Sequence, residues 1–291
     1  MAGPFAPSET HKLLAGVEQQ MEERTLRKEQ VRCIKKLRLE KRVLCAADDA
    51  KEQKRKLVFP FQVVKMPTLD EFRHRIMMQN KPVIITGAME FWPALGRAAG
   101  PDRAWKNEEY IRRVAGLRTV PVELENNGTD SGNPGSQAAP SNKLGYLAQH
   151  RLFDQIPALG RDIVTPDYCT VQRANHTNDG EDEDITINCW FGPGGTVSPL
   201  HFDRKDNLLC QVVGVKYVRL YAPEESEKLY AMEGLLSNTS QVQVENPDNN
   251  KFPEFCHAKY VECILSEAQA GSDVCYRFGS NRCMLEVTRR S

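Results

Sequence analysis

Residues 185–222 alternate short apolar runs with turn residues, and this pattern constrains the fold more than any other part of the chain. The run ITINCWF has a period of two, which is typical of a strand with one buried face. After the turn GPGG come three further runs, TVSPLHFD, LLCQVV and VKYVRLYAP, and Gly214 makes the turn before the last of them. We predict a β-meander whose polar interior lines a small barrel or double-stranded β-helix that holds a ligand.

Helical patterns surround this predicted sheet. Residues 8–56 lack proline and favour a helix, and TLDEFRHRIMMQN favours a second one with Thr68 as its N-cap. EEYIRRVAG predicts another helix, and GYLAQHRLFDQIPALGRDI is predicted to be helical in its first half. KPVIIT, ending at Gly87, and RTVPVEL read as strands. The fold class is therefore mainly β with flanking helices (α+β).

Two polar segments interrupt these elements. Residues 126–142 and 173–184 contain almost no apolar side chains, so we predict flexible loops. His176 falls in the second loop and is expected to be an exposed polar residue. Asn127, Asn175 and Asn238 each begin a glycosylation sequon, and we interpret all three as chance matches.

Composition narrows the functional classes. The 291 residues carry a formal net charge of zero, which gives no support for direct nucleic-acid binding. No apolar run approaches the roughly 18 residues of a membrane span, and no secretory leader is visible, so no membrane association is expected. The nine cysteines show no CxxC spacing and are interpreted as reduced intracellular thiols, with Cys189 and Cys210 in the core. The basic runs KKLRLEKR and KEQKRK fit either a solvated helical face or a nuclear-import or nucleic-acid patch.

His201 and Asp203 are the strongest candidate functional pair. At positions i and i+2 of a strand they point to the same face, roughly 6–7 Å apart along the chain. Such a pair can share a cation, and two histidines with one carboxylate form the non-heme Fe(II) oxygenase site. A surface histidine near a charge is the alternative interpretation of so short a motif.

Three neighbouring residues strengthen the metal hypothesis. Lys216 shares a strand face with apolar residues, so it either faces inward and pairs with a di-acid such as 2-oxoglutarate, or reaches solvent at a sheet edge. Asn207 and Ser198 flank the pair in sequence. Both could donate hydrogen bonds to an anionic ligand, or satisfy turn backbone.

The stretches GYLAQHRLFDQIPAL, ITINCWFGPGGTVSPLHFDRKDNLLCQVVGVKYVRLYAPEES and NTSQVQVENPDNNKFPEF resemble the Jumonji-C (JmjC) oxygenases. The resemblance implies a cupin-like double-stranded β-helix at residues 58–266, after a basic helical segment at 1–57 and before a divergent tail at 267–291. Its implied cofactors are Fe(II), 2-oxoglutarate and O₂. The implied activity is a dioxygenase acting on protein side chains, by arginyl hydroxylation and/or histone lysine demethylation. The implied partner is a histone or a ribosomal or chromatin-associated protein. The implied location is the nucleus, with the cytoplasm as a further location.

The resemblance also assigns roles to individual residues. His201 and Asp203 resemble two iron ligands. Lys216 resembles the partner of the distal carboxylate of 2-oxoglutarate. Further contacts with 2-oxoglutarate are implied for Tyr146, Ser198 and Asn207. Trp190 resembles an aromatic wall of the pocket, and Glu123 resembles a carboxylate that could bind a substrate guanidinium.

The tail departs from the family pattern. The family places a second histidine, its third iron ligand, after the strand that follows CILS, and no histidine occurs here beyond His257. His257 precedes that strand, and Cys283 falls near the ligand position, where a free cysteine is the expected interpretation. We therefore expect a β-helix that is incomplete at its C-terminal end. A catalytically impaired isoform that acts as a binding or regulatory protein is the alternative function.

Overall fold

The computed structural model describes residues 62–79, 81–125, 144–171, 185–203, 205–244 and 246–266, the strands at 275–278 and 283–289, and five helical positions between 20 and 28. Most of the helix predicted for residues 8–56 lies outside these ranges. So do the two predicted loops, residues 126–142 and 173–184, and with them His176. Within the described part of the chain, no helix has the length and apolar character needed to cross a membrane.

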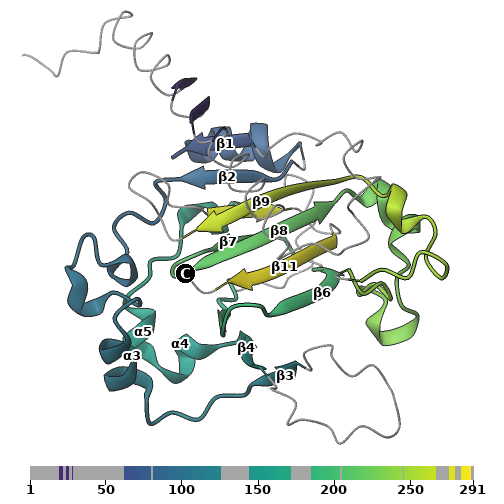
Figure 1. Ribbon diagram of the computed structural model, residues 1–291. Coiled ribbons are helices and arrows are strands. Elements are labelled where there is room, and N and C mark those ends of the chain that lie inside the picture. Colours follow the sequence, from purple (N-terminus) through teal and green to yellow (C-terminus); the bar gives the residue numbers. More distant parts are fainter. Residues whose placement is uncertain are drawn as a thin grey trace, which may run out of the picture.

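Two four-stranded sheets form the body of the protein (Figure 1). The first sheet has the order β1-β2-β10-β7, and its strands are β1 (Gln62–Lys65), β2 (Val83–Thr86), β10 (Cys275–Phe278) and β7 (Asn207–Cys210). The second has the order β6-β11-β8-β9, with β6 (Val197–Phe202), β11 (Cys283–Arg289), β8 (Val215–Tyr221) and β9 (Tyr260–Ser266).

The consecutive strands β6, β7 and β8 alternate between the two sheets, so the predicted meander is wrong. β6 and β8 belong to one sheet, while β7, which lies between them in sequence, belongs to the other. The turn at Gly214, with φ of +80°, therefore carries the chain across the fold and does not close a hairpin. This alternation is the double-stranded β-helix that was predicted, and its strand positions agree with the sequence pattern.

The C-terminal strands correct the expectation of an incomplete β-helix. β10 pairs with both β2 and β7, and β11 pairs with both β6 and β8, all antiparallel. Each of these strands therefore occupies an inner position of its sheet. Without them β7 and β6 would lose their ladder partners, because backbone N–H and C=O groups in a sheet need a neighbouring strand.

A third, three-stranded sheet contradicts one of the helix predictions. Its order is β3 (Glu123–Glu125), β4 (Leu144–His150) and β5 (Cys189–Phe191). The start of GYLAQHRLF is strand β4, not helix, because β3 and β5 pair with it on both sides. Helix begins only at α4 (Leu152–Gln155), followed by α5 (Pro157–Gly160). Likewise, only the last three residues of ITINCWF form a strand.

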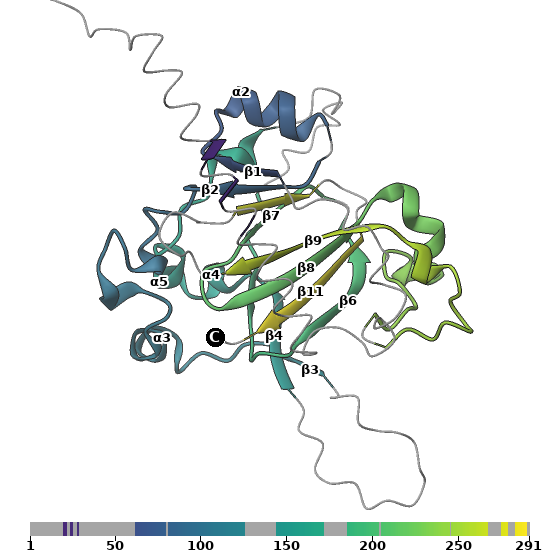
Figure 2. The same ribbon diagram turned by 45° about the horizontal axis from the view of Figure 1, so that its top comes forward.

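The remaining helices are short and flank the sheets, with α2 above the β1–β2 edge in Figure 2. Helix α2 (Leu69–Glu71) starts at the predicted N-cap Thr68, which forms a capping box with Glu71. Asn107 caps α3 (Glu108–Ala115). The single-turn elements are the π-helix η3 (Phe72–Met77) and the 3₁₀ helices η4 (Pro93–Leu95), η5 (Pro101–Arg103), η6 (Asp167–Thr170), η7 (Pro223–Leu229), η8 (Gly234–Leu236) and η9 (Phe255–His257).

The buried carboxylate of Asp162 connects η5, α3 and the segment between them through hydrogen bonds. Asp162 is fully buried, and it accepts hydrogen bonds from Arg103 Nε at 2.8 Å and Trp105 Nε1 at 3.1 Å. The Tyr110 hydroxyl, on α3, donates a third bond to the same carboxylate. These donors offset the cost of burying the charge.

Strand β8 separates two apolar clusters and thereby defines the inside of the β-helix. Val218 and Leu220 pack with residues of β1, β2 and β9 between the sheets. Tyr217 and Tyr221, the alternating residues, pack on the other side with Leu200 and with the segment from η7 to η9. Lys216 shares the alternation of Val218 and Leu220, so it belongs to the inner face.

Candidate metal and co-substrate site

The end of β6 presents His201 with one ring nitrogen already bonded. Its Nδ1 lies 2.7 Å from the Pro199 carbonyl oxygen. Because a carbonyl can only accept, Nδ1 must carry the hydrogen, and neutral His201 then has its lone pair on Nε2. Metal-binding histidines commonly donate their other ring N–H to such an acceptor. His201 therefore has the tautomer that a metal ligand needs.

Asp203 follows the end of β6 and is held by the first residue of β7. Asn207 Nδ2 donates a hydrogen bond of 2.6 Å to Asp203 Oδ2. This bond connects the two strands across the turn and orients the carboxylate. Among the described residues no other hydrogen bond reaches Asp203, so Oδ1 can still bind a cation.

These two side chains fit part of a metal site. An imidazole nitrogen and a carboxylate oxygen are the ligand types of non-heme iron. In the ranges that the structure describes, no three His, Cys, Asp or Glu side chains are close enough to hold an ion together. The third protein ligand is therefore not among the described side chains.

Strand β11 lies next to the end of β6, which carries the candidate ligand His201. Its register places Met284 opposite His201 and Cys283 opposite Phe202. Cys283 therefore pairs with Phe202, the middle residue of the His201–Asp203 motif, and not with His201. His257 ends η9, before β9, and does not join His201 and Asp203 in a cluster of described metal-binding side chains.

Lys216 is buried, with 4% of its surface exposed. This burial decides between the two interpretations of the sequence, because an edge lysine that reached solvent would be largely exposed. Burial raises the pKa of the nearby Cys189 thiol to about 11, and the positive charge of Lys216 opposes that rise. Cys189 and Cys210, predicted to be core residues, are both half-buried and line a cleft, and Cys210 also packs against the core cluster that contains Phe72 and Ile85.

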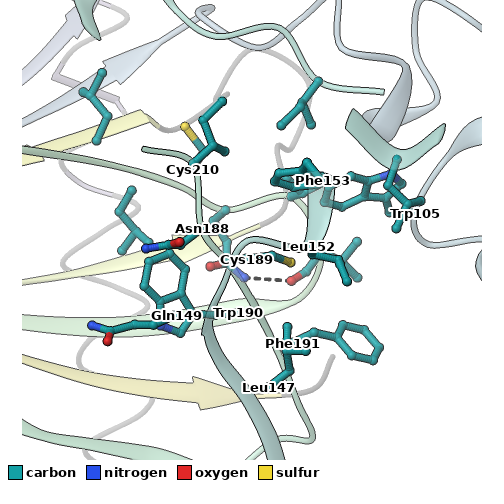
Figure 3. Close-up of a pocket in the computed structure, with 18 of the residues that line it drawn as sticks. Trp105, Leu147, Gln149, Leu152, Phe153, Asn188, Cys189, Trp190, Phe191 and Cys210 are labelled. Atoms are coloured by element: carbon teal, nitrogen blue, oxygen red, sulfur yellow. Dashed lines mark hydrogen bonds between the residues drawn. The ribbon is translucent and has the colours of Figure 1, made fainter. Parts of the chain in front are cut away.

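A single cleft contains most of the predicted site. Figure 3 shows part of it, with Trp190 and Cys189 from β5 and Gln149 from β4. The predicted site residues that line this cleft are Tyr146, Trp190, Asp203, Asn207 and Lys216. The structure therefore brings together residues that are up to 70 positions apart, from 146 to 216.

Ser198 reaches the same face as His201 through a β-bulge. Their spacing of three would put them on opposite faces of a regular strand. On β11, however, Glu286 pairs with Ser198 and Met284 pairs with His201, so two steps on β11 match three steps on β6. The extra residue in β6 is a bulge, and it returns Ser198 to the face of His201.

The Tyr146 ring packs closely against Gly192, which the sequence pattern predicted only to be part of a turn. Tyr146 is 4% exposed, and a Cβ added to Gly192 would lie 2.4 Å from its Cδ2 atom. Gly192 therefore makes room for the ring. The signal in the sequence is the GPGG run itself, whose first glycine serves packing and not only the turn.

Glu123 and Trp190 lie at the outer part of the site. Glu123 is opposite Tyr146 in the β3–β4 register, so the two side chains share a face of the sheet. Glu123 is exposed, and Trp190 is 38% exposed. Neither is part of the buried interior, and of the two only Trp190 lines the cleft.

Comparison with known proteins identifies the class of this fold. Residues 131–270 match the model of the cupin-like domain family. The chain is also 38% identical over 229 residues to "JmjC domain-containing protein D" of Dictyostelium discoideum and 35% identical over 217 residues to "Jumonji C domain-containing protein 5" of Drosophila melanogaster. It therefore belongs to the cupin-like proteins of the JmjC type.

The curated relatives refine this assignment. The chain is 49% identical over 217 residues to "Lysine-specific demethylase 8" of Xenopus tropicalis, covering 70% of this chain and 45% of that protein. It is 47% identical over 217 residues to the protein of the same name in Danio rerio, covering 69% of this chain and 50% of the relative. "Lysine-specific demethylase JMJ30" of Arabidopsis thaliana is 39% identical over 220 residues, covering 69% and 47%. The chain thus spans about half the length of the curated relatives it matches.

Proposed function

We propose that this chain is an Fe(II)- and 2-oxoglutarate-dependent dioxygenase acting on protein side chains, by arginyl hydroxylation and/or histone lysine demethylation. The observation that carries the proposal is the cleft in which Asp203 and Asn207 lie with the buried cation Lys216, next to His201. The names of the relatives, lysine-specific demethylases, support it.

In this proposal His201 Nε2 and Asp203 hold Fe(II), and the Nδ1 bond to Pro199 fixes the tautomer of the histidine. Lys216 pairs with the distal carboxylate of 2-oxoglutarate in a site from which water is excluded, where a charge-assisted bond is strong. When bound, Fe(II) with 2-oxoglutarate supplies the activation of O₂ that oxidises a substrate C–H bond.

The other residues orient the co-substrate. Asn207 already holds Asp203, so its role couples the metal ligand to the co-substrate pocket. Tyr146, packed against Gly192, and Ser198, on the face of His201, would donate hydroxyl hydrogen bonds to the 2-oxoglutarate carboxylates.

The substrate is a protein segment that carries arginine or lysine, from a histone or from a ribosomal or chromatin-associated protein. Glu123 would bind a cationic side chain, with two parallel hydrogen bonds if it is a guanidinium. The exposed part of Trp190 would form a wall beside it and could also contact a cation through its ring. We also propose nuclear residence, which imaging of the tagged chain tests.

The alternative, an impaired isoform that only binds, rests on the unassigned third ligand. It is not favoured, because the matched relatives are named as demethylases and because β10 and β11 take inner positions in the sheets. Water or the co-substrate would have to occupy the coordination positions that the protein leaves open.

Turnover of the co-substrate tests the proposal. We expect the purified chain, with Fe(II), 2-oxoglutarate, ascorbate and O₂, to form succinate. The His201→Ala variant should lose this activity, while His74→Ala should keep it, because His74, on η3, is exposed and pairs with the exposed Asp70 of the adjoining α2. Succinate formation that is absent in the wild type, or unchanged in His201→Ala, contradicts the proposed function.

A further inference from the structure

Asn238 forms two hydrogen bonds with Phe202, the residue between the two proposed metal ligands. The N–H of Phe202 donates to the Asn238 carbonyl at 2.9 Å, and the Asn238 Nδ2 amide donates to the Phe202 carbonyl at 3.2 Å. The first bond holds the peptide group that joins residues 201 and 202. The second holds the peptide group that joins residues 202 and 203. One residue therefore fixes both peptide planes of the His-x-Asp motif.

A hairpin keeps Asn238 in place. Met232 N donates to Thr239 O and Gln241 N donates to Tyr230 O, both at 2.8 Å. The returning arm of this hairpin also pairs with the end of β6, through a bridge between His201 and Thr239. Ser240 N donates to the Leu200 carbonyl at 2.7 Å in the same alignment. Asn238 is thus part of a rigid support and not of a loose loop.

This support matters because the strand ends inside the motif. β6 ends at Phe202, so Asp203 has no ladder position of its own. The backbone between the two ligands sets the direction in which each side chain points, and a carboxylate displaced by an ångström weakens its bond to a cation. The Asn238 side chain contributes the Nδ2 bond to Phe202, which both substitutions below remove. Its Oδ1 also accepts a hydrogen bond of 3.4 Å from the Thr239 hydroxyl, and aspartate keeps that acceptor.

We infer that Asn238 is a positioning residue of the metal site, acting through the Phe202 peptide groups. The inference rests on the proposed function. It also assigns a role to a residue whose sequence context suggested only a chance glycosylation sequon. The Asn238 side chain is half-buried and its amide nitrogen is engaged in the bond to Phe202, which an attached glycan would disturb.

Metal affinity tests this role without turnover. Mn(II) binding to the whole chain is measured by electron paramagnetic resonance at 25 °C, for the wild type, Asn238→Ala and Asn238→Asp. Both variants lose the amide donor and keep the backbone bonds, so we expect their Mn(II) affinity to fall by about tenfold or more. The matched control is Asn249→Ala, since Asn249 is exposed, and its affinity should equal that of the wild type.

The outcomes separate the two claims. Circular dichroism confirms that each variant is folded at the measuring temperature, because a general loss of stability would lower the melting temperature but not the Mn(II) affinity of folded protein. Affinities of both variants within twofold of the wild type overturn the positioning role and leave the proposed function intact. Variants that do not fold assign Asn238 a structural role and also overturn it. A wild type that binds no Mn(II) overturns the proposed function itself, and the positioning role with it.

Discussion

Replacing Lys216 with methionine should separate co-substrate binding from metal binding. Lys216 is 4% exposed and lies opposite Leu265, so methionine matches both the length of its alkyl chain and the apolar surroundings. The proposed carboxylate partner would then be buried without its cation. Truncating one partner of such a pair costs about 2–5 kcal/mol, of which much is the penalty for the unpaired charge.

This free energy converts to a loss of 2-oxoglutarate affinity between about 30-fold and several thousand-fold, since 1.4 kcal/mol corresponds to a factor of ten. Calorimetric titration of 2-oxoglutarate into Mn(II)-loaded protein measures it. Mn(II) affinity itself should stay within about threefold, because Lys216 is not a proposed ligand. The control is Lys81→Met, which changes an exposed lysine outside the cleft. If Lys216→Met binds 2-oxoglutarate like the wild type, the assignment of its partner is refuted.

Two further substitutions test the surroundings of the site. Asp162→Asn should lower the free energy of unfolding by about 2–3 kcal/mol in urea denaturation, because it removes the charge of a fully buried carboxylate whose cationic partner is partly solvated. Asp154→Asn, at a side chain that is 74% exposed, should change it by less than about 0.5 kcal/mol, and equal effects would contradict the account. Gly192→Ala should cost about 1–3 kcal/mol and weaken 2-oxoglutarate binding, since its Cβ would meet Tyr146. Gly145→Ala adds a Cβ with no atom within 4 Å and should have little effect; the reverse order would refute the packing argument.

Local sequence signals predicted the strands but not their arrangement. β6 and β8 agree with their predicted positions within two residues, and β7 ends three residues before its predicted end, because alternation and turn residues are local properties. The sheet that each strand joins depends on β9, β10 and β11, which lie far along the chain. The same limit explains β4, whose sequence favours a helix but whose neighbours on both sides are strands.

Spacing predicted the candidate site only in part. β6 ends at Phe202, so the strand geometry used to predict a shared face for His201 and Asp203 does not reach Asp203. The alternation left two interpretations of Lys216 open, and its burial decides for the inner face. The face of Ser198 depends on a bulge that forms only against β11. Asn238 is 36 residues away from Phe202 in sequence, and no local pattern indicates that contact.

Anaerobic addition of Fe(II) and 2-oxoglutarate tests the central claim most directly. If His201 and Asp203 hold iron next to Lys216, chelation of the metal by 2-oxoglutarate should give a visible charge-transfer band in the wild type. The band should be absent in Asp203→Ala and weakened in Lys216→Met at the same co-substrate concentration. A wild-type chain that shows no band, although it is folded and both reagents are in excess, contradicts the account.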